Sequence, residues 1–191
     1  MFEYIVKKYF PDLIEKAKNN KILRKELLIA AFFTNMMIYS IPLYLFSYYY
    51  IILPNSFLID YSKFLAYILE ISNINFQLYQ NVIYVKNISF VIDQECTGFK
   101  SVFGIFALIF STPILSTPIL DLKKKIKYFI IFSLILYLIN IFRLWSVFYL
   151  YYFFNINPYF VHNLLWEIFT TLFLIIFWSI FLFKNKDKLF V

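Results

Sequence analysis

The chain has 191 residues, of which 62% are hydrophobic and 15% charged, and its net charge at pH 7 is +7. A soluble domain is about half apolar and about a quarter charged, so this composition excludes an ordinary soluble fold and indicates a protein of the lipid bilayer. The basic residues lie in short clusters between long apolar runs, which favours membrane topology over nucleic-acid binding. A single cysteine and a single histidine exclude an internal disulfide and a Cys/His metal site, and we expect no cofactor.

The amino-terminal third predicts a basic segment followed by a transmembrane helix. Residues 1–26 are polar and rich in Lys and Arg, and they predict an amphipathic helix on the membrane surface. The apolar run 27–53 is longer than the roughly 20 residues that a spanning helix needs. In residues 55–74, charged side chains interrupt the apolar ones, so this segment predicts an interfacial helix, with a fifth span as the alternative.

The segment 75–93 has a different period. Aromatic and β-branched residues recur at alternate positions, which is typical of strands. Either Gln80-Asn81 or Lys86-Asn87 supplies a turn. The segment therefore predicts a small extracytoplasmic β-hairpin-like element just before the helix that begins after Cys96.

The remaining sequence predicts three more membrane spans. The basic stretch 121–127 and the polar stretch 155–163 separate them as loops. The expected fold class is an all-α polytopic membrane protein. Its four transmembrane helices are predicted at 27–53, 97–120, 128–153 and 164–183.

The distribution of basic residues predicts the orientation in the membrane. Most of the 18 Lys and Arg residues lie in segment 1–26, in loop 121–127 and in the tail 184–191. Four spans bring these three segments to the same side, which the positive-inside rule identifies as the cytoplasm. Residues 27–183 then form a membrane-embedded domain with both termini cytoplasmic, and the segment 54–96 faces outward.

Cys96 is the first candidate for chemistry, because it lies where a polar segment meets a helix. The free N–H groups of a helix N-terminus lower the pKa of a thiol. Glu95 opposes this effect, so a nearby cation would be needed to favour the thiolate. An inert apolar cysteine is the alternative interpretation.

Arg143 is the candidate cation, since it lies inside a predicted span, where a charge costs at least about 2.5 kcal/mol on insertion scales. Such a group could stabilise a thiolate, bind an oxyanion or hold a substrate carboxylate. Asn140 shares its helix face, three residues earlier. A structurally paired arginine, with Glu167 as its partner, is the alternative.

His162 is the candidate for proton transfer. A pKa near about 6.5 suits that role, and a neighbouring imidazole activates a thiol without a metal. Asn163 or Glu167 is placed to orient the ring. A surface histidine is the alternative. The predicted topology brings Cys96, Arg143 and His162 to the outer half of the membrane.

Three motifs follow one another along the chain: Glu95-Cys96-Thr97-Gly98-Phe99-Lys100-Ser101, then Asn140-Ile141-Phe142-Arg143, then His162. In order and spacing they resemble the exosortase/archaeosortase family, in which a Cys and small residues begin a span, Asn-x-x-Arg lies in a later span and a His lies near the following one. The resemblance covers about residues 75–170. The Cys-Thr-Gly form is closer to the archaeal branch.

The resemblance implies a membrane-embedded cysteine peptidase or transpeptidase. Its partner would be a secreted surface protein with a C-terminal sorting signal, made of a short motif, a transmembrane helix and a basic tail. Cleavage near the motif would transfer the new carboxyl end to a lipid or another acceptor. By this resemblance Cys96 is the nucleophile, His162 the proton shuttle and Arg143 the stabiliser. The supporting residues are Glu95, Thr97, Gly98, Asn140 and Asn163.

Two other functions are compatible with the sequence. A non-enzymatic membrane assembly factor or transporter subunit would leave the three motifs as coincidences. A membrane acyltransferase acting through Cys96 would react with activated lipid in place of a tailed protein.

Overall fold

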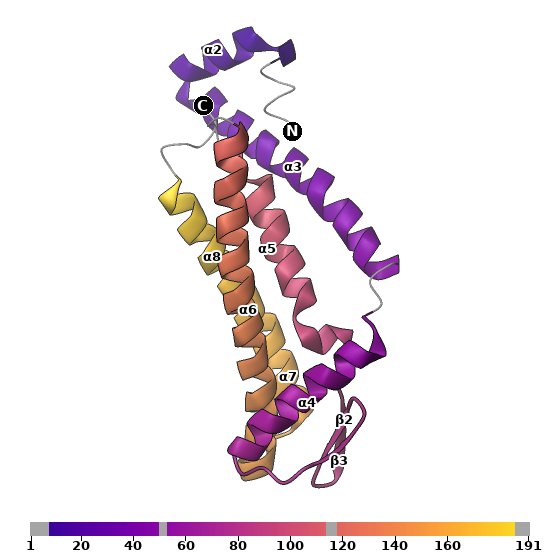
Figure 1. Cartoon of the computed structure of the whole chain (residues 1–191). Helices are drawn as coiled ribbons and strands as arrows, with labels where there is room; N and C mark the ends of the chain where they lie inside the picture. Colours follow the sequence, from indigo (N-terminus) through magenta and orange to yellow (C-terminus); the bar gives the residue numbers. More distant parts are fainter. Residues whose placement is uncertain (1–7, 50–52, 114–117, 186–191) are drawn as a thin grey trace. The chain divides into compact units, whose positions relative to one another are not determined.

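The computed structural model describes residues 8–49, 53–113 and 118–185, and most of them are helical (Figure 1). Two compact units divide the chain: the first comprises Met1–Tyr48, Phe103–Phe132 and Ile175–Val191, and the second comprises Tyr49–Val102 and Ser133–Leu174. The α-helices are α2 (Pro11–Asn19), α3 (Lys21–Tyr49), α4 (Asn55–Ile71), α5 (Phe99–Ser111), α6 (Pro118–Phe154), α7 (Pro158–Leu164) and α8 (Thr171–Lys184).

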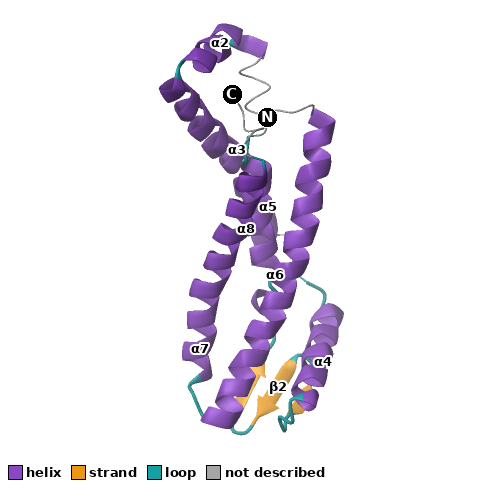
Figure 2. Cartoon of the chain, turned by 90° about the vertical axis from the view of Figure 1, so that its left-hand side faces the viewer, coloured by secondary structure: helices purple, strands orange, loops and turns teal. Residues whose placement is uncertain are grey.

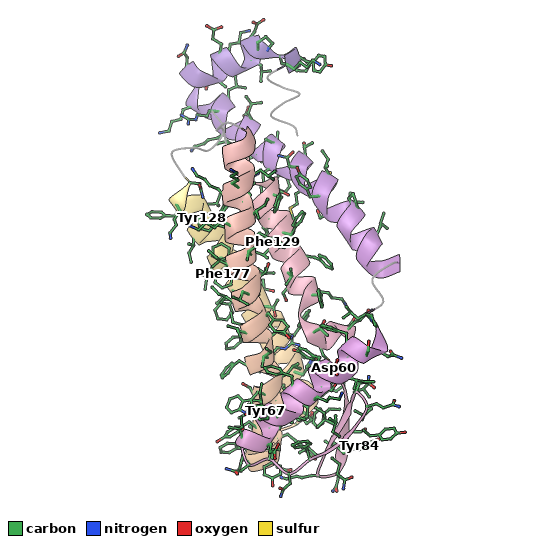
Figure 3. All side chains as sticks on the ribbon, viewed as in Figure 1. Asp60, Tyr67, Tyr84, Tyr128, Phe129 and Phe177 are labelled. Carbon is green, nitrogen blue, oxygen red and sulfur yellow. The ribbon has the colours of Figure 1, made fainter. Side chains whose placement is uncertain are left out.

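The first unit is held together by aromatic side chains. Phe32 of α3 stacks on Trp178 of α8, with ring centroids 5.2 Å apart, and Phe132 of α6 stacks on Phe177 at 4.8 Å. Phe177 is labelled on α8 in Figure 3. The indole N–H of Trp178 also donates to Thr112 Oγ1 at 3.0 Å. These aromatic contacts are in line with the 26 phenylalanines of the chain.

The predicted basic loop at 121–127 is wrong, because these residues belong to helix α6. Lys125 explains part of this difference. Its Nζ donates to the carbonyl oxygens of Phe110 and Thr112, at 3.1 and 2.7 Å, and so satisfies free carbonyls at the end of α5. Lysine is also a good helix former, so a basic stretch can continue a helix that hydropathy alone would end.

Two helices are long and apolar enough to cross a membrane among the described residues, Leu122–Phe154 and Pro158–Lys184. They cover the predicted spans at 128–153 and 164–183, so both segments are helices of sufficient length, and their place in a membrane stays a prediction. The helix found at the predicted span 27–53 is α3, Lys21–Tyr49, and residues 50–52 of that span lie outside the described residues. The count of four spans is not confirmed.

The predicted span 97–120 is wrong in its extent. The helix there, α5, has 13 residues and ends at Ser111, and α6 begins at Pro118. A helix of that length is about 20 Å long, which is less than the roughly 30 Å of a hydrocarbon core. Residues 114–117 of this predicted span lie outside the described residues.

The second unit contains the small sheet that the sequence predicted, with three strands in place of a hairpin. Strands β1 (Gln77–Tyr79), β2 (Val82–Val85) and β3 (Ile88–Val91) form an antiparallel sheet in the order β1-β2-β3. Both predicted turns are used, since Gln80-Asn81 joins the first pair and Lys86-Asn87 the second. The sheet precedes Cys96 directly, as expected.

Helix α4 lies beside this sheet (Figure 2) and covers it with one face. Tyr61, Leu65 and Leu69 are buried there, together with residues of β2 and α6. Outward-facing side chains include Tyr67 of α4 and Tyr84 of β2, both labelled in Figure 3. The segment 55–74 is therefore helical over most of its length, and its placement at the membrane interface stays a prediction.

Candidate active site

Cys96 lies in a single 3₁₀ turn, Gln94–Thr97, between the sheet and α5. The side chain of Asp93 begins the turn, because its carboxylate accepts hydrogen bonds from the backbone N–H groups of Glu95 and Cys96 at 2.9 and 3.1 Å. Thr97 is buried, and its hydroxyl donates to the Gln94 carbonyl at 2.6 Å. Asp93 and Thr97 thus hold the cysteine in a defined turn. The N–H groups of Glu95 and Cys96 already donate to the Asp93 carboxylate, so these two do not favour the thiolate in the way expected of a free helix N-terminus.

Gly98 and Asn140 position the cysteine from the other side. The φ angle of Gly98 is +81°, in the left-handed region that favours glycine. A Cβ at this position would lie 3.0 Å from Cγ of Asn140. The absence of a side chain therefore lets Asn140 approach, and its Nδ2 donates to the carbonyl oxygen of Cys96 at 2.6 Å.

Sequence reasoning missed Tyr61, which completes this network. Its hydroxyl accepts from Asn140 Nδ2 at 3.1 Å and donates to the Cys96 carbonyl at 3.5 Å. Burial raises the pKa of Tyr61, so the hydroxyl stays a neutral donor. No sequence signal separates this tyrosine from the sixteen others, because its role depends on how α4 packs. Asp93 was also missed, although an aspartate shortly before a helix is a recognisable capping signal.

The charges near the thiol oppose one another. Burial raises the pKa of Cys96 to about 11, a backbone hydrogen bond at Asp93 lowers it, and the Asp93 carboxylate raises it. The positive charge of Arg143 lowers this pKa and is the smallest of these effects. Glu95, expected to disfavour the thiolate, forms an ion pair with Lys100 on the surface. The resting cysteine is therefore a neutral thiol, and a base must take its proton before it can act as a nucleophile.

This state of the thiol predicts an alkylation profile. With the pKa of Cys96 raised from 9.0 to about 11, the iodoacetamide rate should rise about tenfold per pH unit through pH 10 without a plateau. Cys96 is the only cysteine of the chain, so mass spectrometry of the intact protein reports this site alone. In Arg143→Met the rate at each pH should be lower, because the cation that favours the thiolate is gone. A plateau below pH 9 in the unmodified chain would contradict the assignment.

Cys96 and His162 line the same cavity, which has a volume of about 410 Å³. Asn163 and Glu95 line it too. The predicted loop position of His162 is wrong, because the residue lies in the last turn of helix α7. That helix begins early because the Asn157 side chain accepts from the Tyr159 N–H at 2.9 Å and Pro158 occupies its first position.

Arg143 is not part of the lining of that cavity. It is 4% exposed, and its guanidinium has no hydrogen-bond partner among the described side chains. The side chain of Glu167, its alternative partner, lies outside those that the structure describes. The group lies over the ring of Trp166, 4.6 Å from the centroid. With Asn140, Ser101 and several apolar side chains, Arg143 lines a second cavity of about 300 Å³ within the same unit.

The short distance between Gly98 and the side chain of Asn140 predicts that a methyl group at position 98 destabilises the protein. Gly98→Ala should lower the free energy of unfolding by roughly 1–3 kcal/mol, from the left-handed backbone and the contact with Asn140. It should also slow any reaction at Cys96, since Asn140 must shift. Gly104→Ala is the matched control, because Gly104 lies inside α5 without positive φ, and alanine there should stabilise the helix by up to about 1 kcal/mol. Thermal unfolding in detergent measures both variants, and equal effects would contradict this prediction.

Among the described residues, no three His, Cys, Asp or Glu side chains gather so as to hold a metal ion. The fold and the cavity together define a mostly helical membrane protein in which a cysteine and a histidine share one site.

The chain belongs to the transmembrane exosortase family, whose sequence profile (Exosortase_EpsH) matches residues 25–183. Membership indicates a membrane transpeptidase of protein sorting that acts on substrates bearing a sorting signal. No curated protein and no solved structure matches the chain significantly.

Proposed function

We propose that this protein is a membrane-embedded cysteine transpeptidase that removes the C-terminal sorting signal of secreted surface proteins. The observation that carries the proposal is the shared cavity of Cys96 and His162 in a member of the exosortase family. A thiol and an imidazole in one cavity are the two groups that acyl transfer through a thioester needs. The Cys96-Thr97-Gly98 sequence supports an archaeosortase-like member.

The proposed reaction has two steps. The imidazole of His162 takes the proton of the Cys96 thiol, the sulfur attacks the scissile carbonyl carbon, and the C–N bond breaks as His162 gives the proton to the leaving amine. The product is a thioester at Cys96, and the tail departs with a free amino group. The acceptor, which is a hydroxyl, an amine or water, then attacks the thioester carbonyl and gives its proton to His162. The C–S bond breaks, and His162 returns the proton to the sulfur of Cys96.

The other site residues act around this pair. Asn140, with Tyr61, holds the Cys96 carbonyl and so positions the nucleophile. Arg143 acts through its field, which favours both the thiolate and the negative charge of the tetrahedral intermediate. Asn163, beside His162 in the lining of the cavity, is proposed to orient the imidazole.

A lipid is the acceptor that the second cavity supports. Its lining is mostly apolar, including Phe142, Phe169 and Phe173, and it contains the cation of Arg143. A phospholipid offers a hydrocarbon chain and an anionic phosphate, which match those two features.

The proposed orientation in the membrane follows the positive-inside rule. The catalytic domain comprises residues 27–183, both termini are cytoplasmic and the active site faces outward.

The test is co-expression with a secreted protein of the same genome that ends in a short motif, one apolar helix and a few basic residues. Mass spectrometry of its C-terminus is expected to show loss of the tail only when this enzyme is present. The mass of the new end then identifies water or a lipid as acceptor. The same protein without its basic tail is the control. Equal processing with and without the enzyme would refute the proposal.

A further inference from the structure

Strand β3 lies at the edge of the sheet, and it borders the cavity that contains Cys96 and His162. In the order β1-β2-β3, only one side of β3 is paired, through the register Ile83↔Phe90 and Val85↔Ile88 with β2. All four residues of β3 line the cavity that contains Cys96 and His162. The unpaired edge of β3 therefore lies close to Cys96, the proposed nucleophile.

The ladder identifies which backbone groups point outward. Just beyond β3, the N–H of Ile92 donates to the Asn81 carbonyl at 2.8 Å, so this pair is hydrogen-bonded. Bonded and non-bonded pairs alternate along an antiparallel ladder, which directs the N–H and C=O groups of Ser89 and Val91 away from β2. Among the described residues these groups have no backbone partner. An open edge of this kind is a template for another strand.

A groove accompanies this edge. The start of α7, with Pro158 and Tyr159, contributes to the lining of the cavity along with β3, and Leu144 and Phe148 of α6 add apolar surface. An extended peptide fits such a site because its backbone can bond to the strand while alternate side chains meet the apolar residues.

The thiol of Cys96 contacts a backbone group on the open edge of β3. Cys96 Sγ lies 4.0 Å from the Val91 carbonyl oxygen, to which the thiol donates. A strand added to β3 would offer its own N–H to that same oxygen. The added strand would thus take the acceptor from the resting thiol and place its peptide carbonyls beside the sulfur.

We infer that the cleavage segment of the substrate binds as a fourth strand on β3, with backbone hydrogen bonds to Ser89 and Val91. The inference rests on the proposed function and specifies how that function recognises its substrate. Backbone hydrogen bonds supply affinity for an extended segment of varied sequence. The apolar residues Leu144 and Phe148 favour apolar side chains at every second position of that segment. Strand β1, the other edge of the sheet, does not line this cavity.

A proline at an outward-facing position tests the pairing. Val91→Pro removes an N–H that β2 does not use, so the β2–β3 ladder can persist. Val91→Thr keeps the N–H and the β-branched shape, and it is the matched control. With the tail-bearing protein described above as substrate, Val91→Pro should slow processing by about tenfold or more, and Val91→Thr by less than about threefold. Equal rates in the two variants would overturn the inference.

Disulfide cross-linking between β3 and the substrate provides a second test, which does not depend on the folding of Val91→Pro. Ser89→Cys in a Cys96→Ala background is combined with single cysteines placed along the cleavage segment of the same substrate. Strand addition predicts disulfides at every second substrate position, whereas a helical or irregular segment predicts another period or none, which would refute the inference. Processing by the unmodified enzyme is measured in parallel. Its failure would count against the proposed function, while processing without the period of two would count against strand addition alone.

Discussion

Replacing Cys96 with alanine is expected to lower the rate of tail removal by about 10³-fold or more, because no other side chain can form the thioester. Cys96→Ser should be nearly as slow, since a hydroxyl beside a single imidazole is a much weaker nucleophile than a thiol. The measurement is the fraction of processed substrate over time, read from the mass of its C-terminus.

Folding must be separated from chemistry in this experiment. Cys96 is half-buried, and its hydrogen bonds with Asp93 and Asn140 use backbone atoms. The thiol itself makes one long contact, 4.0 Å to the Val91 carbonyl oxygen, so both variants should unfold thermally within a few degrees of the unmodified chain. Retention of more than about a tenth of the rate in Cys96→Ala would show that the residue is not the nucleophile. A large loss of stability would instead assign Cys96 a packing role.

The second large effect is expected at Arg143, where activity and stability should move in opposite directions. Arg143→Met removes the charge and keeps much of the side-chain volume. Because Arg143 acts through its field and does not line the Cys96 cavity, its loss should lower the rate by about tenfold or more, and by less than the roughly 10²–10³-fold that follows loss of a donor in direct contact with an oxyanion. A buried cation without a hydrogen-bond partner among the described residues is unfavourable, so its neutral replacement should leave the free energy of unfolding unchanged or raise it by about 1–3 kcal/mol.

Arg143→Lys is the control for charge alone. Lysine keeps the field that acts on Cys96, but it makes a weaker contact with the ring of Trp166 than the planar guanidinium does. Its activity should therefore lie between that of the unmodified chain and that of Arg143→Met. If Arg143→Met lowers the melting temperature and the activity together, the arginine is structural, and its proposed part in the chemistry fails.

Several features were predictable because they depend on local sequence. Period two in residues 75–93 indicates strands without knowledge of any distant contact, and the sheet of β1, β2 and β3 is found there. The long apolar runs of 128–153 and 164–183 indicate helices for the same reason. The polar-to-apolar change at Cys96 also marks a boundary between two kinds of structure. Local sequence patterns were therefore enough to predict the class of protein and the region of the site.

The errors arise where one helix acts on another. The lysines of 121–127 predict a loop, but Lys125 donates to the carbonyls at the end of α5 and the helix continues through them. The stretch around His162 is polar enough to predict a loop, yet Asn157 and Pro158 begin a helix before it. In both cases a few hydrogen bonds outweigh the local hydropathy.

Only the tertiary structure decided which side chains meet in the site. Asn140 is 44 residues from Cys96 in sequence, and Tyr61 is 35. Helix α6 is apolar on most of its surface, so its sequence does not reveal which face turns toward the cysteine. The same ambiguity hid that Arg143 lies over Trp166 and outside the lining of the Cys96 cavity. The rotation of such a helix about its axis depends on how its aromatic side chains pack against their neighbours, and a one-dimensional pattern of hydrophobicity does not contain that information.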